Sequence, residues 1–370
     1  MFNRREFVKA TAESAAAVVF TGCSLLDTAQ QSAASPPKRR QVLVGGKRVR
    51  TIDVHAHCSI PEAMALMNLA PAGALTAAPV SSAKDLLMEP EIAAVRLQKM
   101  DAQGIDMQVL SINPYWYAAG RDVAERLIRI QNEKLAEVCA ANPERFSGLA
   151  TVALQFPELA ADQLVEGVKK LGLRGVSIGA RVNGEELSAR KFDPFWAKAE
   201  ELKVMIFMHP QPDPIKRLEG NGVLNNVINN PLETTIALSH LIFEGTLDRY
   251  PGLKLCSAHG GGYLPSYADR SDHGCLAFPQ QCGKPALKKQ PTEYLRRLYF
   301  DSIVFSPEAL RHLIATTGPE QIAMGTDYPF PWTTTSVDHI LSTPGVTNEQ
   351  RRAILGETAA KLLGLPPKNN

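Results

Sequence analysis

Residues 51–57, Thr-Ile-Asp-Val-His-Ala-His, decide how this chain folds and where its chemistry lies. The short apolar run at their start is typical of a β-strand. Successive side chains of a strand point to opposite faces, so the i, i+2 spacing of His55 and His57 places both imidazoles on one side. Two neutral imidazoles in that position form a chelating pair for a metal ion.

Three further clusters end short apolar runs in the same way. They are Met208-His209-Pro210, His259-Gly260-Gly261-Gly262 and Gly325-Thr326-Asp327-Tyr328-Pro329. When such runs are the parallel strands of one closed sheet, the residues that follow them converge at one end of it. Three imidazoles and a carboxylate would then surround a metal ion.

From residue 51 onward, strand-like and helix-like segments alternate, which is the pattern of βα units. The expected strands are Thr51–His55, Met107–Ile112, Gly148–Ala153, Gly175–Ile178, Val204–Met208, Leu253–Ala258, Tyr299–Ile303 and Ile322–Gly325. The expected crossover helices include Val123–Ala141, Pro157–Leu171, Pro194–Leu202, Leu232–Tyr250 and Pro307–Thr317. Eight repeats predict an α/β fold, a (β/α)₈ TIM barrel, rather than an open sheet. No glycine-rich dinucleotide-binding fingerprint follows the first expected strand, which counts against a Rossmann fold.

The composition fits a folded enzyme and excludes some partners. With 370 residues, of which 45% are hydrophobic and 21% charged, the chain can bury a large core. Its 40 Lys and Arg nearly balance 38 Asp and Glu, and no basic stripe carries interleaved aromatic residues. We therefore expect no nucleic-acid partner.

The N-terminal residues indicate export. Asn3-Arg4-Arg5-Glu6-Phe7-Val8-Lys9 matches the twin-arginine pattern and precedes an Ala-rich stretch. We expect residues 1–23 to be a twin-arginine signal peptide, residues 24–40 a flexible linker and residues 41–370 the barrel. Thr21-Gly22-Cys23 resembles a lipoprotein acylation site. The protein is thus expected in the periplasm, either free or anchored by a lipid at Cys23.

The cysteines give no sign of a structural zinc site. None of the six stands at zinc-finger spacing, and Cys275 and Cys282 are the only close pair. In an oxidising periplasm these two residues can form a disulfide, and the sequence leaves both the bonded and the free state open.

The clusters, in this order along the chain, resemble the amidohydrolase-related branch of the amidohydrolase superfamily, and within it the 2-amino-3-carboxymuconate-6-semialdehyde decarboxylases. The matching motifs are Asp-x-His-x-His, Met-His-Pro, Ala-His-Gly-Gly-Gly and Gly-Thr-Asp-Tyr-Pro-Phe-Pro. Residues 100–106, Met-Asp-Ala-Gln-Gly-Ile-Asp, add a less specific match. The resemblance covers roughly residues 50 to 365 and is strong for fold and family, but weaker for substrate.

The resemblance implies one divalent metal ion, zinc in the first place, held by His55, His57, His209 and Asp327. It also implies that His259 moves protons beside the metal, with Asp327 as a second donor. Nitrogen and oxygen ligands with an open position suit catalytic zinc, although the sequence does not separate zinc from manganese. No lysine ends the fourth expected strand, which disfavours a carbamylated-lysine site with two metals.

Each of these residues also has a plainer interpretation. A single histidine at a strand end is more often a hydrogen-bonded structural residue than a ligand, and only the shared position of the four makes a ligand set the better interpretation. For His259, the glycine run Gly260–Gly262 is also compatible with a tight turn that lets backbone approach backbone. Asp53 is expected to support the first strand through hydrogen bonds and not to bind metal.

The resemblance gives a mixed answer on the substrate. Arg270 matches an arginine that grips a substrate carboxylate from a neighbouring subunit, which implies a homodimer, but it can equally be an ion-pair partner of Asp269 or Asp272. A second arginine is missing between residues 58 and 95, and Arg96 matches a different position.

Aromatic residues are the other candidates for contact with a substrate. Trp332 with Phe330, and the cluster Tyr115-Trp116-Tyr117, are placed to line the barrel mouth, or else belong to ordinary packing. The weakly charged segment from Cys58 to Leu87 would suit an apolar loop over that mouth.

These residues predict an enzyme that acts on a small carboxylate. The leading expectation is non-oxidative decarboxylation of an aromatic or enolic carboxylic acid. The same site can hydrolyse an ester, lactone or amide, which is the second expectation. A catalytically silent metal- or ligand-binding barrel is the third, because a fold alone does not prove a reaction.

Overall fold

The computed structural model of this protein describes residues 39–69, 84–211, 215–219 and 222–366. The expected signal peptide with Cys23, nearly all of the expected linker and residues 70–83 of the apolar segment lie outside the described residues. At the linker boundary, Arg39 pairs with Asp106 (Nη2 to Oδ1, 2.5 Å), so this residue belongs to the folded part. Among the described helices, none is both long and apolar enough to cross a bilayer.

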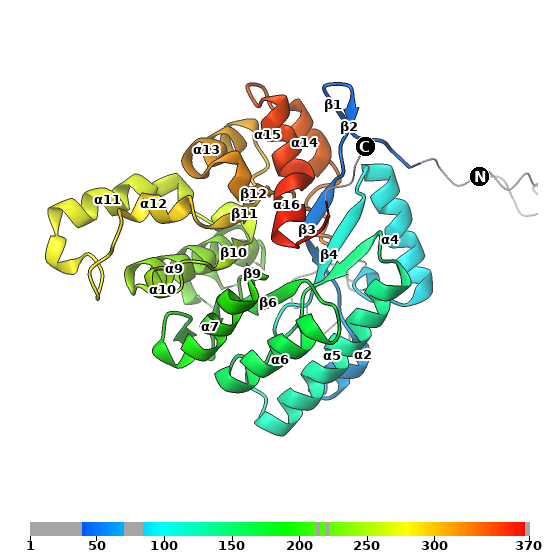
Figure 1. Cartoon of the computed structure of the whole chain (residues 1–370), viewed down its shortest axis with the longest axis horizontal. Coiled ribbons are helices and arrows are strands. Elements are labelled where there is room, and N and C mark those ends of the chain that lie inside the picture. The colour runs from blue at the N-terminus through cyan, green and yellow to red at the C-terminus, as the bar shows by residue number, and fades with distance from the viewer. Residues whose placement is uncertain (1–38, 70–83, 212–214, 220–221, 367–370) are drawn as a thin grey trace, which may run out of the picture. The chain divides into compact units, whose positions relative to one another are not determined.

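Eight parallel strands within the described residues form a closed barrel (Figure 1), as the sequence predicts. They are β3 (Ile52–His57), β4 (Met107–Ser111), β5 (Phe146–Gly148), β6 (Gly175–Gly179), β9 (Met205–His209), β10 (Lys254–Ser257), β11 (Tyr299–Asp301) and β12 (Ile322–Ala323). Pairing runs from β3 to β5 and from β6 through β9, β10 and β11 to β12. Bridges between Ala150 and Val176 and between Ala56 and Tyr328 close the two gaps.

Helices follow the strands along the chain and surround the sheet (Figure 1). They are α2 (Pro61–Ala65), α4 (Pro90–Gln103), α5 (Arg121–Ala141), α6 (Pro157–Lys169), α7 (Asp193–Leu202), α8 (Gly222–Leu224), α9 (Asn230–Phe243), α10 (Thr246–Arg249), α11 (Ala268–Ala277), α12 (Pro291–Leu295), α13 (Pro307–Thr317), α14 (Ser336–Ser342), α15 (Asn348–Arg352) and α16 (Thr358–Leu362). Five of them begin at proline, whose missing N–H costs nothing in the first turn of a helix. Two antiparallel hairpins, β1 (Leu43–Val44) with β2 (Lys47–Arg48) and β7 (Arg181–Val182) with β8 (Glu185–Glu186), lie outside the barrel.

Most of the expected elements agree with the structure to within two residues at each end, and two of them differ more. The expected helix Leu232–Tyr250 is interrupted at Gly245, whose φ of 73° lies in the left-handed region, so it becomes α9 and α10. The expected strand Gly148–Ala153 is regular only up to Gly148, where β5 ends. Hydrogen bonds from Leu149 N–H to Leu110 and from Ala150 N–H to Gly175 continue its pairing without regular strand geometry.

Helix α16 packs against the amino-terminal half of the barrel interior. Leu362 and Leu363 belong to the same buried apolar cluster as Ile52, Met107 and Met205, which begin their strands. Complete burial of each leucine side chain contributes about 1.5–3 kcal/mol to folding. The polar ends of the strands therefore face away from a well-packed apolar end.

The two cysteines left open by the sequence, Cys275 and Cys282, form a disulfide at the end of α11. Their Cα atoms lie 4.8 Å apart. In Figure 1, α11 and α12 (yellow) extend away from the strands, so the disulfide closes a loop far along this arm.

Candidate metal centre

The four side chains expected to hold a metal converge at the carboxyl end of the strands. His55 and His57 end β3, His209 ends β9, and Asp327 follows β12. All four are buried, and one ligand atom from each lies within 4.8 Å of the others. His57 and Asp327, which are 270 positions apart in the chain, thus meet because parallel strands place their carboxyl ends together.

The distances in this group fit a single cation. Nε2 of His55 lies 3.0 Å from Nε2 of His57, and Oδ1 of Asp327 lies 2.9 Å from His57 Nε2 and 3.1 Å from His55 Nε2. Ligand atoms at about 2.0–2.1 Å from zinc stand about 2.9–3.4 Å apart in five- or four-coordinate geometry. These three donor atoms therefore have the spacing and chemistry of ligands of one divalent metal ion, and the ligand atom of His209 lies within 4.8 Å of them.

Hydrogen bonds orient two of the imidazoles toward the centre. His55 donates its Nδ1–H to Asp301 Oδ2 over 2.6 Å, and His209 donates its Nδ1–H to the carbonyl of Pro210 over 2.9 Å. In these tautomers each Nε2 carries a lone pair that faces the group. Such supporting bonds are typical of histidines that bind metal.

Burial and charge shift the pKa values at the centre in opposite directions. Burial opposes charge on His55, but the carboxylates of Asp327 and Asp301 outweigh it and raise the pKa to about 10. For His57, burial dominates and lowers the pKa to about 4, and it lowers the pKa of His209 as well. Burial also opposes charge on Asp327, yet the surrounding imidazoles hold its pKa well below the ordinary value. A cation that binds here competes with a proton for the imidazole nitrogen atoms.

His259 lies beside this group. Its Nε2 is 3.6 Å from Asp327 Oδ2, and its ring centre is 5.2 Å from that of His55 and 5.3 Å from that of His209. The side chain is 15% exposed, whereas His55 and His57 are almost completely buried. His259 is thus the imidazole of the site that solvent or a substrate reaches.

The glycine run after His259 is required for close packing, in agreement with the plainer interpretation. A Cβ atom at Gly262 would lie 2.1 Å from the carbonyl oxygen of Pro231, and one at Gly261 would lie 2.7 Å from the Phe300 ring. The turn also brings His259 to the site. The tight-turn interpretation is therefore confirmed, and the role of His259 in proton transfer stays a prediction.

Asp53 supports the first strand, as expected. Its carboxylate accepts hydrogen bonds from the backbone N–H groups of His55 and Thr326, from the Thr326 hydroxyl and from the Gln108 amide. Burial nonetheless raises its pKa to about 6. Asp53 is not part of the group that could hold a metal.

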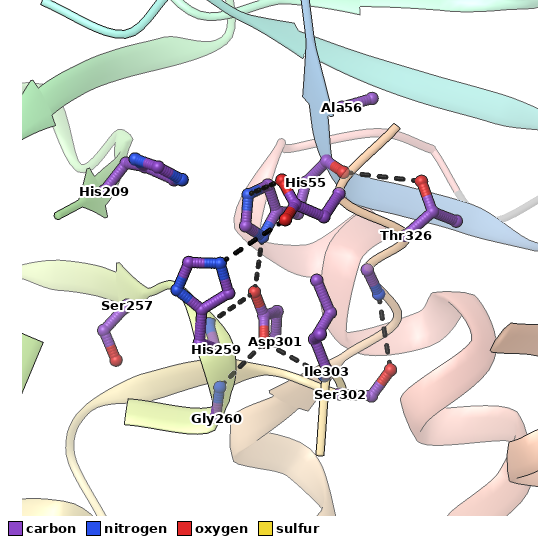
Figure 2. A network of polar contacts seen from close by, with 12 residues as sticks. His55, Ala56, His209, Ser257, His259, Gly260, Asp301, Ser302, Ile303 and Thr326 are labelled. Carbon is purple, nitrogen blue, oxygen red and sulfur yellow. Dashed lines mark hydrogen bonds and ion pairs between the residues drawn. The ribbon is translucent and has the colours of Figure 1, made fainter. Parts of the chain in front are cut away.

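The sequence interpretation missed Asp301, the last residue of β11. This buried carboxylate contacts His55 and the backbone of His259 (Figure 2). The available signal was an acidic residue inside the mainly apolar expected strand Tyr299–Ile303. Asp301 stands in no recognisable motif, so the motifs alone do not predict its role.

Arg270 and the aromatic candidates lie in different places. Arg270 is exposed on α11, and the described residues give it no ion pair, so neither Asp269 nor Asp272 holds it. Trp332 is 40% exposed and packs on Phe305, with ring centres 6.0 Å apart. The Phe330 ring lies 5.5 Å from that of His57, next to the candidate metal.

The other aromatic cluster belongs to packing. Trp116 is completely buried and donates its Nε1–H to the carbonyl of Val152. Tyr117 is buried, and its hydroxyl oxygen accepts a hydrogen bond from the backbone of Gly179. Of the two interpretations that the sequence left open, ordinary packing therefore holds for these two residues, because their polar atoms already bond to the barrel wall.

Arg96, which does not match a substrate arginine, is a buried support. Its Nη2 donates to the carbonyl of His57 over 2.5 Å, and its guanidinium lies 4.5 Å from the centre of the Tyr328 ring. Burial lowers its pKa. The side chain thus holds the backbone of His57 and packs on the ring of Tyr328, next to two of the candidate metal ligands.

Known proteins share this arrangement of sequence and fold. The Amidohydrolase family model matches residues 52–365. The 2-amino-3-carboxymuconate-6-semialdehyde decarboxylase of Dictyostelium discoideum is 34% identical over 74% of this chain and 77% of its own length.

Two solved structures resemble the chain along most of its length. The 5-carboxyvanillate decarboxylase of Sphingomonas paucimobilis has a TM-score of 0.74 and 27% identity, and the match covers 86% of this chain and 100% of that one. A dihydroxybenzoic acid decarboxylase from Polaromonas, solved with manganese and the inhibitor 2-nitroresorcinol, has a TM-score of 0.75 and 26% identity over 85% and 97%. With the family model and the relative above, these matches show that the chain belongs to the amidohydrolase family.

Proposed function

We propose that this protein is a metal-dependent, non-oxidative decarboxylase of an aromatic carboxylic acid. The observation that carries the proposal is the group of three imidazoles and one carboxylate, with ligand atoms within 4.8 Å, next to the more exposed His259. The relatives described above are decarboxylases of carboxylic acids, and they support the same reaction.

The reaction requires a place for an electron pair and a source for one proton. The bond between the ring carbon and the carboxylate breaks, carbon dioxide leaves, and the electron pair stays on the ring carbon until that carbon takes a proton. A divalent cation, when bound, supplies positive charge that stabilises the negative charge developing on the substrate.

We assign the proton transfer to Nε2 of His259. This residue is the accessible imidazole of the site, and the Asp327 carboxylate lies 3.6 Å away, where it would orient the ring. The low pKa of Asp327 favours this orienting role over its expected role as a second donor.

We propose zinc as the resident metal, with manganese as the alternative. Three nitrogen ligands and one oxygen ligand suit zinc, whereas manganese prefers a larger share of oxygen ligands. The Polaromonas relative contains manganese, so the two metals need a direct test. Elemental analysis of the purified protein, followed by chelation and reloading with each metal, would identify the ion that restores turnover.

The test of the function measures carbon dioxide. The metal-loaded protein is incubated with 5-carboxyvanillate, dihydroxybenzoates and 2-amino-3-carboxymuconate 6-semialdehyde, and the released gas is quantified beside the chelated protein. Carbon dioxide release that depends on metal supports the proposal. Turnover of esters or lactones to acids without carbon dioxide would replace decarboxylation by hydrolysis. Stoichiometric metal without turnover of either panel would favour a silent barrel.

We further propose that the enzyme is a homodimer in which Arg270 reaches the substrate of the second copy. Arg270 is exposed on α11, and its helix and neighbourhood also expose Tyr267 (71%), Leu276 (69%) and Phe278 (60%). Large exposed apolar groups of this kind are typical of an interface. Light scattering should give a dimer, and Arg270→Ala should raise KM without altering that mass.

Trp332 is the proposed aromatic contact for the substrate ring, together with Phe330. The exposed Trp332 and the position of Phe330 beside His57 support this assignment. Trp332→Ala should raise KM more than it lowers kcat, because the ring would bind substrate and transition state alike.

We infer export from the pair Arg4 and Arg5, and lipid attachment from the Thr21-Gly22-Cys23 motif. Arg4→Lys combined with Arg5→Lys should retain the protein in the cytoplasm. If Cys23 is acylated, Cys23→Ser should move the exported protein from the membrane fraction to the soluble periplasmic fraction. An unchanged distribution in either variant would contradict the corresponding inference.

A further inference from the structure

We infer that Asp301 is a positioning residue that couples the candidate metal ligand His55 to the candidate proton donor His259. This inference rests on the metal site proposed above. Asp301 is the last residue of β11 and is completely buried. Figure 2 shows its carboxylate between His55 and the turn that carries His259.

The four hydrogen bonds of this carboxylate divide between its two oxygen atoms. Oδ2 accepts Nδ1–H of His55 over 2.6 Å and the backbone N–H of His259 over 2.8 Å. Oδ1 accepts the backbone N–H groups of Gly260 over 2.8 Å and Ile303 over 3.0 Å. One oxygen atom therefore holds both residues that the reaction needs.

The hydrogen bond from His55 to Asp301 fixes the tautomer of His55, a candidate metal ligand. An Nδ1–H that donates to Asp301 leaves the lone pair on Nε2, which is the atom 3.0 Å from His57 Nε2 and 3.1 Å from Asp327 Oδ1. A carboxylate behind a ligating imidazole also increases its basicity. Loss of the carboxylate should therefore weaken metal binding.

The bonds to the turn hold a backbone that histidine rarely adopts. His259 has a φ of 55° and Gly260 a φ of 60°, both in the left-handed region. A non-glycine residue keeps such a conformation only where its surroundings enforce it. Two successive N–H groups directed at one carboxylate provide that constraint, and they aim the His259 ring at Asp327.

Two other buried carboxylates among the described residues, those of Asp53 and Asp106, have different partners. Asp53 accepts backbone, hydroxyl and amide donors, and Asp106 accepts Thr51 and arginine donors. Within the described part of the chain, neither the Asp53 nor the Asp106 carboxylate forms a hydrogen bond with an imidazole nitrogen. Asp106 thus offers a matched control for the loss of a buried carboxylate that is remote from the site.

The first experiment measures metal affinity, which does not depend on the reaction. Zinc and manganese are titrated against a chelator in the wild type, Asp301→Asn and Asp106→Asn. The asparagine can still accept from Gly260 and Ile303, but its NH₂ group faces the two donors that Oδ2 accepts. We expect the affinity of Asp301→Asn to fall about 10–100-fold and that of Asp106→Asn to stay within about threefold. An unchanged affinity in folded Asp301→Asn would overturn the inference.

The second experiment tests the coupling to His259 at saturating metal. Asp301→Asn should lower kcat with little change in KM, and it should cause no comparable further loss in the His259→Ala background. An equal loss in both backgrounds would overturn the coupling. If the wild type releases no carbon dioxide, the proposed reaction fails, while the metal titration still decides the His55 part.

A measurement on the wild type covers the case in which Asp301→Asn does not fold. In metal-loaded protein labelled with ¹⁵N-histidine, His55 should carry a solvent-protected proton on Nδ1. A His55 ring without a proton on Nδ1 would overturn the inference.

Discussion

Carboxylates at the two ends of the barrel have the same chemistry but different partners. Asp106 precedes β4 at the amino-terminal end, where Thr51 and the guanidinium groups of Arg39 and Arg48 bind it. Asp327 follows β12 at the carboxyl end, where imidazoles surround it. Guanidinium groups stay charged at every relevant pH, whereas an imidazole can release its proton to make room for a cation. The partner therefore decides whether a buried carboxylate serves stability or chemistry.

The two ends also differ in what surrounds their residues. At the carboxyl end, His259 and Asp327 both have a positive φ, at 55° and 61°, and both belong to the candidate site. At the amino-terminal end, Leu362 of α16 and the next residue, Leu363, pack among apolar strand residues. A positive φ also occurs at that end, since Lys203, which follows α7, has a φ of 53°. There the left-handed residue ends a helix, whereas at the site it aims a side chain.

The largest expected effect of any substitution is at a ligand. His209→Ala removes one nitrogen donor, so the metal should be lost. Loss of a residue that only supports a ligand typically lowers metal affinity or activity about 10–100-fold, and we expect turnover of His209→Ala to fall further than this. Elemental analysis and carbon dioxide release measure the two outcomes. A variant that retained stoichiometric metal would show that His209 is not a ligand.

His259→Ala should separate proton transfer from metal binding. We expect kcat to fall about 10²–10⁴-fold because the proton donor is lost, while the metal content stays at the wild-type level. His273→Ala, an exposed histidine on α11, is the control and should have wild-type kcat. Loss of metal in His259→Ala would make that residue a ligand.

At the opposite end, a core substitution should affect stability alone. Leu362→Ala leaves a cavity in the cluster under the barrel and should lower the free energy of unfolding by about 2–5 kcal/mol. Urea denaturation measures the loss, and Leu43→Ala, on an exposed side chain of β1, is the control. A fall in kcat of the folded, metal-loaded variant would contradict this division between the ends.

The smallest effect concerns pH and Asp106. Burial opposes charge there, but Arg48, Thr51 and Arg39 lower the pKa below its ordinary value of 3.8. The unfolded chain then binds more protons than the folded one, so the stabilisation is present above about pH 4 and is lost at lower pH. Asp106→Asn should cost about 1–2 kcal/mol at pH 7 and less at pH 3. An equal loss at both pH values in urea denaturation would assign the stabilisation to packing.

Much of the fold and of the site could be predicted from the sequence, because both depend on periodic patterns. The spacing of His55 and His57 and the strand ends at His209 and Asp327 follow from alternation in parallel strands. Local patterns carry less information about contacts between distant residues. The role of Asp301 depends on its hydrogen bond to His55, which is 246 positions away in the chain, so the folded structure is needed to identify it.

Element bounds and surface contacts were less predictable for a similar reason. The left-handed Gly245 divides an apparently continuous helix, and the residues around it contain no proline. Trp116 and Tyr117 look like mouth residues in the sequence, and only the neighbouring strands show that their polar atoms are already bonded.

The seam of the barrel coincides with its candidate metal centre. Asp327 N–H bonds the carbonyl of His55, and His57 N–H bonds that of Tyr328, so the first and last strands join where the four ligand side chains meet. A nascent chain that lacks the final strand has three of the four donor residues, and its barrel is still open. The chain should thus bind the metal only after its synthesis is complete and the barrel has closed. A chain that terminates before the final strand should have no partial activity.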